Sequence, residues 1–147
     1  MSALKPTKGL RIEEVVLIST TFINFQTSLH DKAGRLTLNV RHSSRSTEDR
    51  IWCDLTCEAT GAVDEKPSWE AKVTFQGLFA LEGALDIDRR NIESINAPAI
   101  VYAYAREYIS DLCRRANVGL VFLPPINFVA SAGTDKEPDV NKKDPNA

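Results

Sequence analysis

The side chains that could take part in covalent or metal chemistry are few and widely spaced. The cysteines are Cys53, Cys57 and Cys113, and the histidines are His30 and His42. No two cysteines have the Cys-x-x-Cys spacing of a zinc or redox site, and both histidines lie among polar residues. We therefore predict reduced, structural thiols and no metal site.

A charged cluster in the second half of the chain is the best candidate for polar chemistry. Glu107 and Asp111 lie four residues apart and would share a helix face, which Arg114 or Arg115 could neutralise. Catalysis would need a nucleophile beside a base, paired carboxylates in a cleft or a phosphate-binding glycine loop, and no such pattern is visible. We interpret the cluster as a solvated, salt-bridged helix face and predict a non-enzymatic protein without a cofactor.

The most informative stretch is an amphipathic helix followed by an apolar segment, between residues 95 and 128. Its apolar residues recur every three or four positions, which predicts one broad buried face. Residues 120–128 then form a proline-broken run too apolar for a solvated loop, so this run must cover or bind something. The helix stripe is Ile100, Tyr104, Tyr108 and Leu112, widened by Val101, Ala105, Ile109 and Ala116, with Pro98 near its start and Asn117 and Gly119 at its end.

The sequence before this helix has the alternation and the β-branched content of strands. The first predicted strand, Ile12 to Gln26, carries apolar residues on both faces. Only one long helix is available to cover a sheet, so we interpret this strand as an interface with a second subunit, over the alternative that the chain covers both faces itself. Its predicted faces are Val16, Ile18 and Phe22 on one side, and Val15, Leu17, Ile23 and Phe25 on the other.

Three further strands complete a predicted α+β fold, a mostly antiparallel four-stranded sheet followed by the long helix. Alternation places the two thiols at Cys53 and Cys57 on an apolar strand face and Trp52 on the opposite face, as an exposed contact or a cover for a second layer. The predicted segments are a turn at 30–34, strands at 36–41, 51–60 and 69–82, a polar serine-rich connection at 42–50, a hairpin connection at 61–67 and a short helical turn at 86–95 capped by Asp86 or Asp88.

Length and composition predict one soluble domain. The chain has 147 residues, of which 43% are hydrophobic, enough for a real core. A net charge of −2 gives no electrostatic footprint for nucleic acid. Without a signal-peptide pattern or an apolar run of about 18 residues, we expect a cytoplasmic protein with no membrane insertion. The predicted organisation is a flexible N-terminus at 1–11, a folded domain at 12–130 and a disordered polar tail at 131–147.

Several motifs together resemble the SecB family of protein-export chaperones. They are FQGLF at 75–79, Ala97-Pro98, YAYAREYI at 102–109 and LPPINF at 123–128. The AYARE helix start and the P-I-N-F ending are the most specific of these. The resemblance runs from the second strand to Phe128 and implies a SecB-like fold. It also implies a homo-oligomer, dimer or tetramer, with the helices held between sheets.

What the resemblance implies for function is a holdase that binds unfolded polypeptide clients in apolar grooves without nucleotide. The loop that matches the family's P-I-N-F segment and the apolar first strand are then the candidate groove walls. The helix and the two-sided strand become the candidate oligomer interface. The client-binding candidates are Phe22, Ile23, Phe25, Trp52, Phe122, Leu123, Ile126 and Phe128, and the interface candidates are Val15, Leu17, Tyr104, Tyr108 and Leu112.

Departures from the export pattern concern the partner. Export members resemble one another in surface carboxylates that dock the basic, zinc-bearing tail of the motor ATPase SecA. Here residues 19–25 contain no carboxylate, and Lys72 stands where the family has an acid, so a basic partner would be repelled. We expect a dedicated client, such as the antitoxin of a toxin–antitoxin–chaperone system. The alternatives are a general export chaperone that delivers preproteins to SecA and a non-chaperone oligomeric scaffold.

Overall fold

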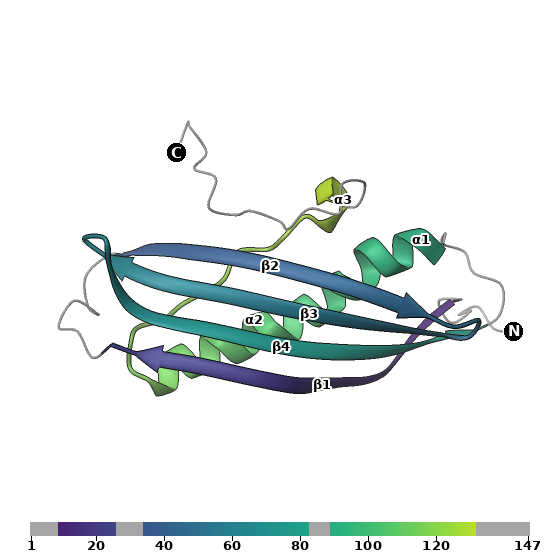
Figure 1. Ribbon diagram of the computed structural model, residues 1–147, viewed down its shortest axis with the longest axis horizontal. Helices are drawn as coiled ribbons and strands as arrows, with labels where there is room; N and C mark the ends of the chain where they lie inside the picture. Colours follow the sequence, from purple (N-terminus) through teal and green to yellow (C-terminus); the bar gives the residue numbers. More distant parts are fainter. Residues whose placement is uncertain (1–8, 26–33, 83–88, 132–147) are drawn as a thin grey trace, which may run out of the picture.

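Four strands and one long helix make up most of the described chain (Figure 1). The structure, a computed structural model, describes residues 9–25, 34–82 and 89–131. The predicted turn at 30–34 lies almost wholly outside these ranges, as does the tail after 131. The elements are β1 (Gly9–Asn24), β2 (Arg35–Ser46), β3 (Arg50–Val63), β4 (Lys66–Glu82), α1 (Arg89–Asn91), the π-helical turn η1 (Ile92–Asn96), α2 (Ala97–Arg115) and α3 (Phe128–Ser131).

The predicted α+β class and antiparallel sheet are confirmed. The strand order is β1-β4-β3-β2, and every neighbouring pair is antiparallel. β3 and β4 are joined by a two-residue turn at Asp64 and Glu65, whose φ angles of 53° and 66° match the twist of a tight hairpin. The predicted hairpin connection was therefore too long, because backbone pairing continues to Val63 and Lys66.

The polar segment at 42–50 is strand over half of its length, so its prediction as a connection was wrong. β2 continues through Ser46, which pairs with Ile51 of β3. A tight connection follows, in which the Thr47 amide donates to the Arg50 carbonyl at 2.9 Å. β2 lies at an edge of the sheet, where backbone pairing holds the strand while polar side chains remain in water.

β1 forms the other edge of the sheet and contains two β-bulges. Register shifts leave Glu13 and Ile18 as the extra residues. Each bulge interrupts the alternation of side chains along the strand. Phe22 consequently lies on the helix-covered side together with Leu17, and not with Val16, so the predicted faces of this strand were partly wrong. The strand also begins at Gly9, within the segment predicted to be flexible.

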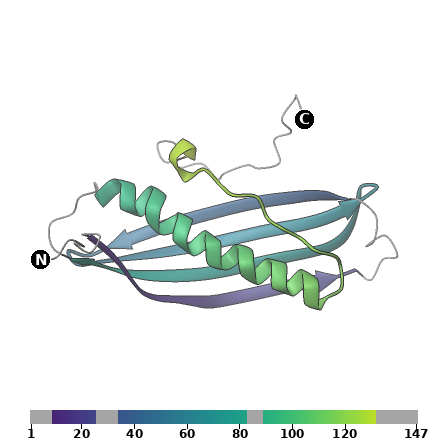
Figure 2. The same cartoon turned by 180° about the vertical axis from the view of Figure 1, so that it is seen from behind.

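α2 packs across one face of the sheet, and no described helix covers the other face (Figure 2). The fully buried side of α2 contains Val101, Ala105 and Ile109, whereas Tyr104 is 43% exposed. The predicted stripe, which includes Tyr104, therefore lies at the margin of the buried face. The residues that were expected only to widen it, such as Val101, Ala105 and Ile109, form its centre. Gly77 of β4 permits this close approach, because an added Cβ would lie 2.6 Å from a methyl carbon of Val101.

The segment before α2 is helical as well. α1 and η1 run directly into α2, while Asp86 and Asp88, the predicted caps, lie outside the described residues. Within the π-helical turn the Ala97 amide donates to the Ile92 carbonyl, and a carbonyl of the same turn also accepts a side-chain donor. This second acceptor, the Glu93 carbonyl, accepts a hydrogen bond from Ser44 Oγ at 3.0 Å, which ties the start of the helix to β2.

The three thiols are buried in the core and none forms a disulfide, as predicted. Burial raises the pKa of Cys53, Cys57 and Cys113 to about 12, because a thiolate would lose its hydration in these surroundings. At neutral pH they are therefore protonated packing groups. Within residues 9–25, 34–82 and 89–131, no cluster of three or more His, Cys, Asp or Glu side chains could hold a metal ion. None of the helices described there has the length and apolar character needed to cross a membrane.

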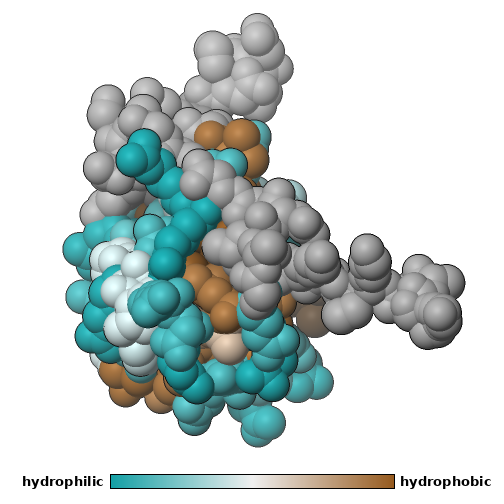
Figure 3. All heavy atoms as spheres, turned by 90° about the vertical axis from the view of Figure 1, so that its right-hand side faces the viewer, coloured by the Kyte–Doolittle hydropathy of each residue, from teal (hydrophilic) through white to brown (hydrophobic). Residues whose placement is uncertain are grey.

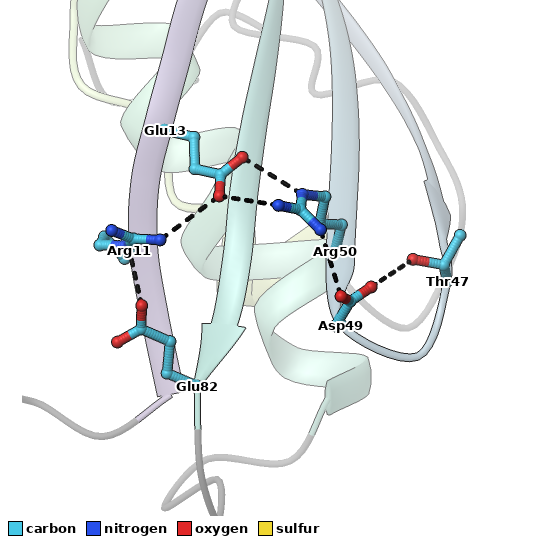
Figure 4. A network of polar contacts seen from close by, with 6 residues as sticks. All are labelled: Arg11, Glu13, Thr47, Asp49, Arg50 and Glu82. Carbon is cyan, nitrogen blue, oxygen red and sulfur yellow. Dashed lines mark hydrogen bonds and ion pairs between the residues drawn. The ribbon is translucent and has the colours of Figure 1, made fainter.

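An ion-pair network on the uncovered sheet face ties the start of β1 to its neighbours (Figure 4). Glu13, the first bulge residue, accepts from Arg50 Nε and Nη2, both at 3.3 Å, and from Arg11 at 3.4 Å. Arg11 also pairs with Glu82 at 2.9 Å. The Glu13–Arg50 pair reaches across β4 at Ala80, whose small side chain leaves room. Each exposed pair stabilises the fold only slightly, but together they fix the bulge.

Candidate functional site

α2 ends in a left-handed turn that sends the chain back along the helix. Asn117 has a φ of 58° and Gly119 a φ of 112°, and the Val118 amide donates to the Cys113 carbonyl at 3.1 Å. Asparagine and glycine tolerate positive φ, so this is a typical helix C-cap, and the predicted end of the helix is confirmed. We call the segment that follows, residues 117–127, the strap. It crosses over the sheet to α3 (Figure 2).

Apolar anchors hold the strap on the core. Val118 near its start and Leu123 in its middle are both buried, as is Phe128 at the start of α3. The Phe128 ring contacts His42 and Tyr102 edge-on, at centroid distances of 5.6 and 6.0 Å. These side chains fix the path of the backbone.

Two hydroxyl groups of α2 bind carbonyls of the strap. Ser110 Oγ donates to the Val121 carbonyl at 2.6 Å, and Tyr102 Oη donates to the Pro124 carbonyl at 2.5 Å. Burial raises the pKa of Tyr102 far above its ordinary value, so the donor stays protonated. The strap is thus held by its buried apolar side chains and by hydrogen bonds to its carbonyls. Its backbone path is therefore fixed without a bound partner.

Removing either hydroxyl should loosen the strap without unfolding the protein. We expect Tyr102→Phe and Ser110→Ala each to lower the free energy of unfolding by about 0.5–1.5 kcal/mol. Amide hydrogen exchange across residues 117–127 should accelerate in both variants. Tyr104→Phe is the matched control, because the Tyr104 hydroxyl has no hydrogen bond within the described chain. An equal acceleration in this control would contradict the assignment.

Between its anchors the strap exposes two large apolar side chains. Leu120 and Phe122 are each 78% exposed. With Val121 they separate two cavities, and we call these three residues the ridge. Contiguous exposed apolar surface is typical of binding sites, which makes the ridge a candidate.

The two cavities lie on opposite flanks of the ridge. The helix groove, of about 500 Å³, runs along the outward face of α2. The edge groove, of about 450 Å³, lies toward the start of β2 and the β3–β4 hairpin. Besides the ridge, the helix groove is lined by Phe75, Tyr104, Glu107, Tyr108, Asp111 and Arg114, and the edge groove by Leu36, Val63, Ser68, Trp69 and Val118.

The helix groove combines tyrosines with a charged rim. Tyr108 packs edge-on against Phe75 at a centroid distance of 5.7 Å. Asp111 pairs with Arg115 at 2.8 Å and also with Arg114, and these guanidinium groups hold the pKa of its carboxyl below the usual range. The predicted salt bridges are present at Asp111, whereas Glu107, the other predicted member of this face, has no ion pair within the described residues. A carboxylate stabilised in this way is a poor general base.

Trp69 forms the floor of the edge groove. Its ring stacks on Phe22 with a centroid distance of 6.0 Å and an interplanar angle of 8°. It also covers Gly61, where an added Cβ would lie 2.1 Å from the indole nitrogen. Sequence alternation indicated Trp69 and Leu36 only as strand residues, and Val63 was placed in the hairpin connection. The strap returns over the ends of these strands and so brings the three side chains close to the ridge. No pattern in the sequence predicts that path.

The predicted client-binding residues of the strap divide into exposed and buried ones. Phe122 lies on the ridge and borders both grooves. Ile126 is half-buried and packs against the core. Leu123 and Phe128 are only 2% exposed, so they support the ridge and do not face a partner.

The predicted client-binding residues outside the strap lie in two places. Ile23 and Phe25 are exposed near the end of β1. Phe22 is half-buried on the helix-covered face against the floor of the edge groove, whereas Ile23 lies on the opposite, uncovered face. Trp52 lies on the uncovered face of the sheet, with the guanidinium of Arg45 5.4 Å from its ring centre. The structure does not bring Trp52 together with the strap.

The predicted interface residues lie along β1 and the outward shoulder of α2. Leu17 and Tyr104 are exposed, while Val15, Tyr108 and Leu112 are half-buried and pack against the core. An end-on view of the molecule shows apolar surface open between hydrophilic side chains (Figure 3). Leu17 pairs with Phe75, which lines the helix groove, so Leu17 and Tyr104 form an apolar strip beside that groove.

The motifs at the helix start and in the strap lie inside a region that matches a known family. The family model described as preprotein translocase subunit SecB matches residues 15–132, from β1 to the end of α3. The chain belongs to the SecB family. The protein-export protein SecB of Neisseria meningitidis serogroup C is 34% identical over 95 residues, which cover 63% of this chain and 65% of that relative. The SecB of Thiobacillus denitrificans is 28% identical over 103 residues, covering 69% and 68%.

The SecB fold also matches a solved structure. This is the Mycobacterium tuberculosis SecB-like chaperone in complex with a ChAD peptide from an antitoxin. The TM-score is 0.68 with 15% sequence identity, and the match covers 79% of this chain and 90% of that chain. This likeness confirms the SecB fold expected from the motifs. The match to the Neisseria SecB spans just under two thirds of that relative's length.

Proposed function

We propose that this SecB-family chain is a holdase that binds unfolded polypeptide segments without nucleotide or cofactor. The observation that carries the proposal is the ridge, where the apolar side chains of Leu120 and Phe122 are held out in solvent between two grooves. Membership of the SecB family supports it, as does a SecB-like structural neighbour whose structure contains an antitoxin peptide. The mechanism needs only binding and release, so no reacting side chain is required.

The edge groove suits an extended client. Every second side chain of an extended chain points the same way, so alternate apolar residues can enter the groove while their backbone follows the ridge. Burial of one large apolar side chain contributes about 1.5–3 kcal/mol. Micromolar binding requires about 8 kcal/mol, so several such contacts must act together. Contacts of this kind select apolar side chains but no particular sequence, so the chain can bind a broad range of clients.

We infer a dedicated client, such as an antitoxin, as the principal partner. On the uncovered sheet face, Lys72 Nζ lies 3.9 Å from Glu58 and Arg41 Nη2 lies 2.8 Å from the same carboxylate. Residues 19–25 of the neighbouring β1 carry no carboxylate. A basic partner such as the SecA tail therefore meets a neutralised surface at this position. We also propose that the chain assembles with copies of itself through the strip beside the helix groove.

Aggregation of an unrelated unfolded protein is the direct test. Chemically denatured citrate synthase should scatter less light after dilution as this chain is added, and ATP should make no difference. Serum albumin at the same mass concentration is the control for crowding. If a correctly folded preparation of the chain protects no better than albumin, the holdase proposal is rejected. A stable oligomer without protection would instead favour the scaffold alternative.

General export is the second candidate, because the curated relatives are named protein-export proteins. Binding to purified SecA at low and high salt separates it from the dedicated role. Tight, salt-sensitive binding to SecA would favour export and contradict the inference from Lys72. Absence of SecA binding, with capture of an antitoxin from the native host, would favour the dedicated client.

A further inference from the structure

The ridge is a wall that two grooves share. Leu120, Val121 and Phe122 line both the helix groove and the edge groove. The carbonyl of Val121 is fixed by Ser110, whereas the side chains of Leu120 and Phe122 stand free in solvent. A molecule in one groove therefore contacts the same two side chains as a molecule in the other.

The helix groove fits a second copy of this chain. It places Tyr104 and Tyr108 beside charges of both signs, Glu107 and Arg114. Two copies related by a twofold axis present this same surface to each other, so opposite charges can meet across it. The side chain of Glu107 has no ion pair or hydrogen bond to any other residue of the described ranges, which leaves its carboxylate available for a cation of the second copy.

We propose that the ridge couples self-association at the helix groove to client binding in the edge groove, so that each strengthens the other. The inference rests on the proposed holdase function. Whichever molecule binds first orders Leu120 and Phe122, and the second molecule binds side chains whose rotamer freedom is already lost. Thermodynamic linkage requires the same factor in both directions, and we expect about three- to tenfold.

Subunit exchange measures this coupling in the intact chain. Two pools carrying different fluorescent labels are mixed, with and without saturating reduced and carboxymethylated α-lactalbumin, and energy transfer reports the exchange. The unfolded client should slow exchange by about three- to tenfold. Leu120→Ala should bring the ratio close to one. Val129→Ala, at an exposed position that lines neither groove, should leave the wild-type ratio unchanged.

Each alternative outcome has a defined meaning. Exchange that is unchanged or faster with client bound would overturn the coupling, and so would a chain that binds client while remaining monomeric at every concentration. A ratio that falls equally in Leu120→Ala and Val129→Ala would overturn the assignment to the ridge. Fluorescence anisotropy of labelled lactalbumin, measured separately, shows whether client binds at all. Its absence would reject the proposed function itself.

Discussion

Replacing Phe122 by aspartate should weaken client binding by about a hundredfold or more while the fold remains intact. The ring borders both grooves and is 78% exposed, so it packs against little of its own subunit. A client then loses the burial of one aromatic ring, about 1.5–3 kcal/mol, and must also desolvate a carboxylate. Fluorescence anisotropy of a labelled unfolded client gives the affinity.

Val129→Asp is the matched control for this variant. Val129 is exposed on α3 and lines neither groove, so the same added charge should leave client affinity nearly unchanged. Circular dichroism and urea unfolding of both variants should match the wild type, because exposed substitutions change stability by about 0.5 kcal/mol or less. If Phe122→Asp bound the client with wild-type affinity, the ridge would not be part of the binding site.

Gly77→Val should destabilise the fold more than any surface change, by about 3 kcal/mol or more. An added Cβ alone would lie 2.6 Å from a methyl carbon of Val101 and 2.8 Å from a ring carbon of Phe79. Those groups belong to the layer between α2 and the sheet, so the helix must lift or the strand must shift. The midpoint of urea unfolding measures the loss.

Two companion variants test this explanation. Gly77→Ala adds only the Cβ and should lie between wild type and Gly77→Val. Lys72→Thr, at an exposed position on the uncovered face of the same strand, should stay within about 0.5 kcal/mol of the wild type. If Gly77→Val unfolded at the wild-type urea concentration, the close approach of α2 to β4 would not be a constraint on the fold.

The sheet and helix were predictable where backbone pairing and side-chain polarity agree. β3 alternates between buried and half-buried residues along its whole length, and this pattern is visible in the sequence. The misassigned stretches are those where the two disagree. Residues 42–46 are polar yet paired, because an edge strand needs only one neighbour and can face water on its other side. The faces of β1 failed for a different reason, since alternation cannot reveal bulges such as those at Glu13 and Ile18.

The strap was recognisable in the sequence as an apolar segment that must contact something. Its SecB-like ending was recognisable from the LPPINF motif at 123–128. The sequence did not indicate which residues of the strap are buried anchors and which form the exposed ridge. Leu123 and Phe122 are adjacent and equally apolar, yet one is 2% exposed and the other 78%. What separates them is the path of the strap, set by the left-handed turn at Asn117 and by hydroxyls of α2 that bind its carbonyls.

The sequence by itself therefore determined local properties: alternation, helix ends, thiols suited to a core, the motifs that carry the SecB resemblance and the absence of carboxylates at 19–25. The tertiary structure alone decided which apolar residues face solvent, how Lys72 and Arg41 neutralise Glu58, and that one short ridge borders two grooves. The physical reason is that exposure depends on what packs against a side chain. Here the packing partners are separated by tens of residues, as for Trp69 and Phe122 in the edge groove.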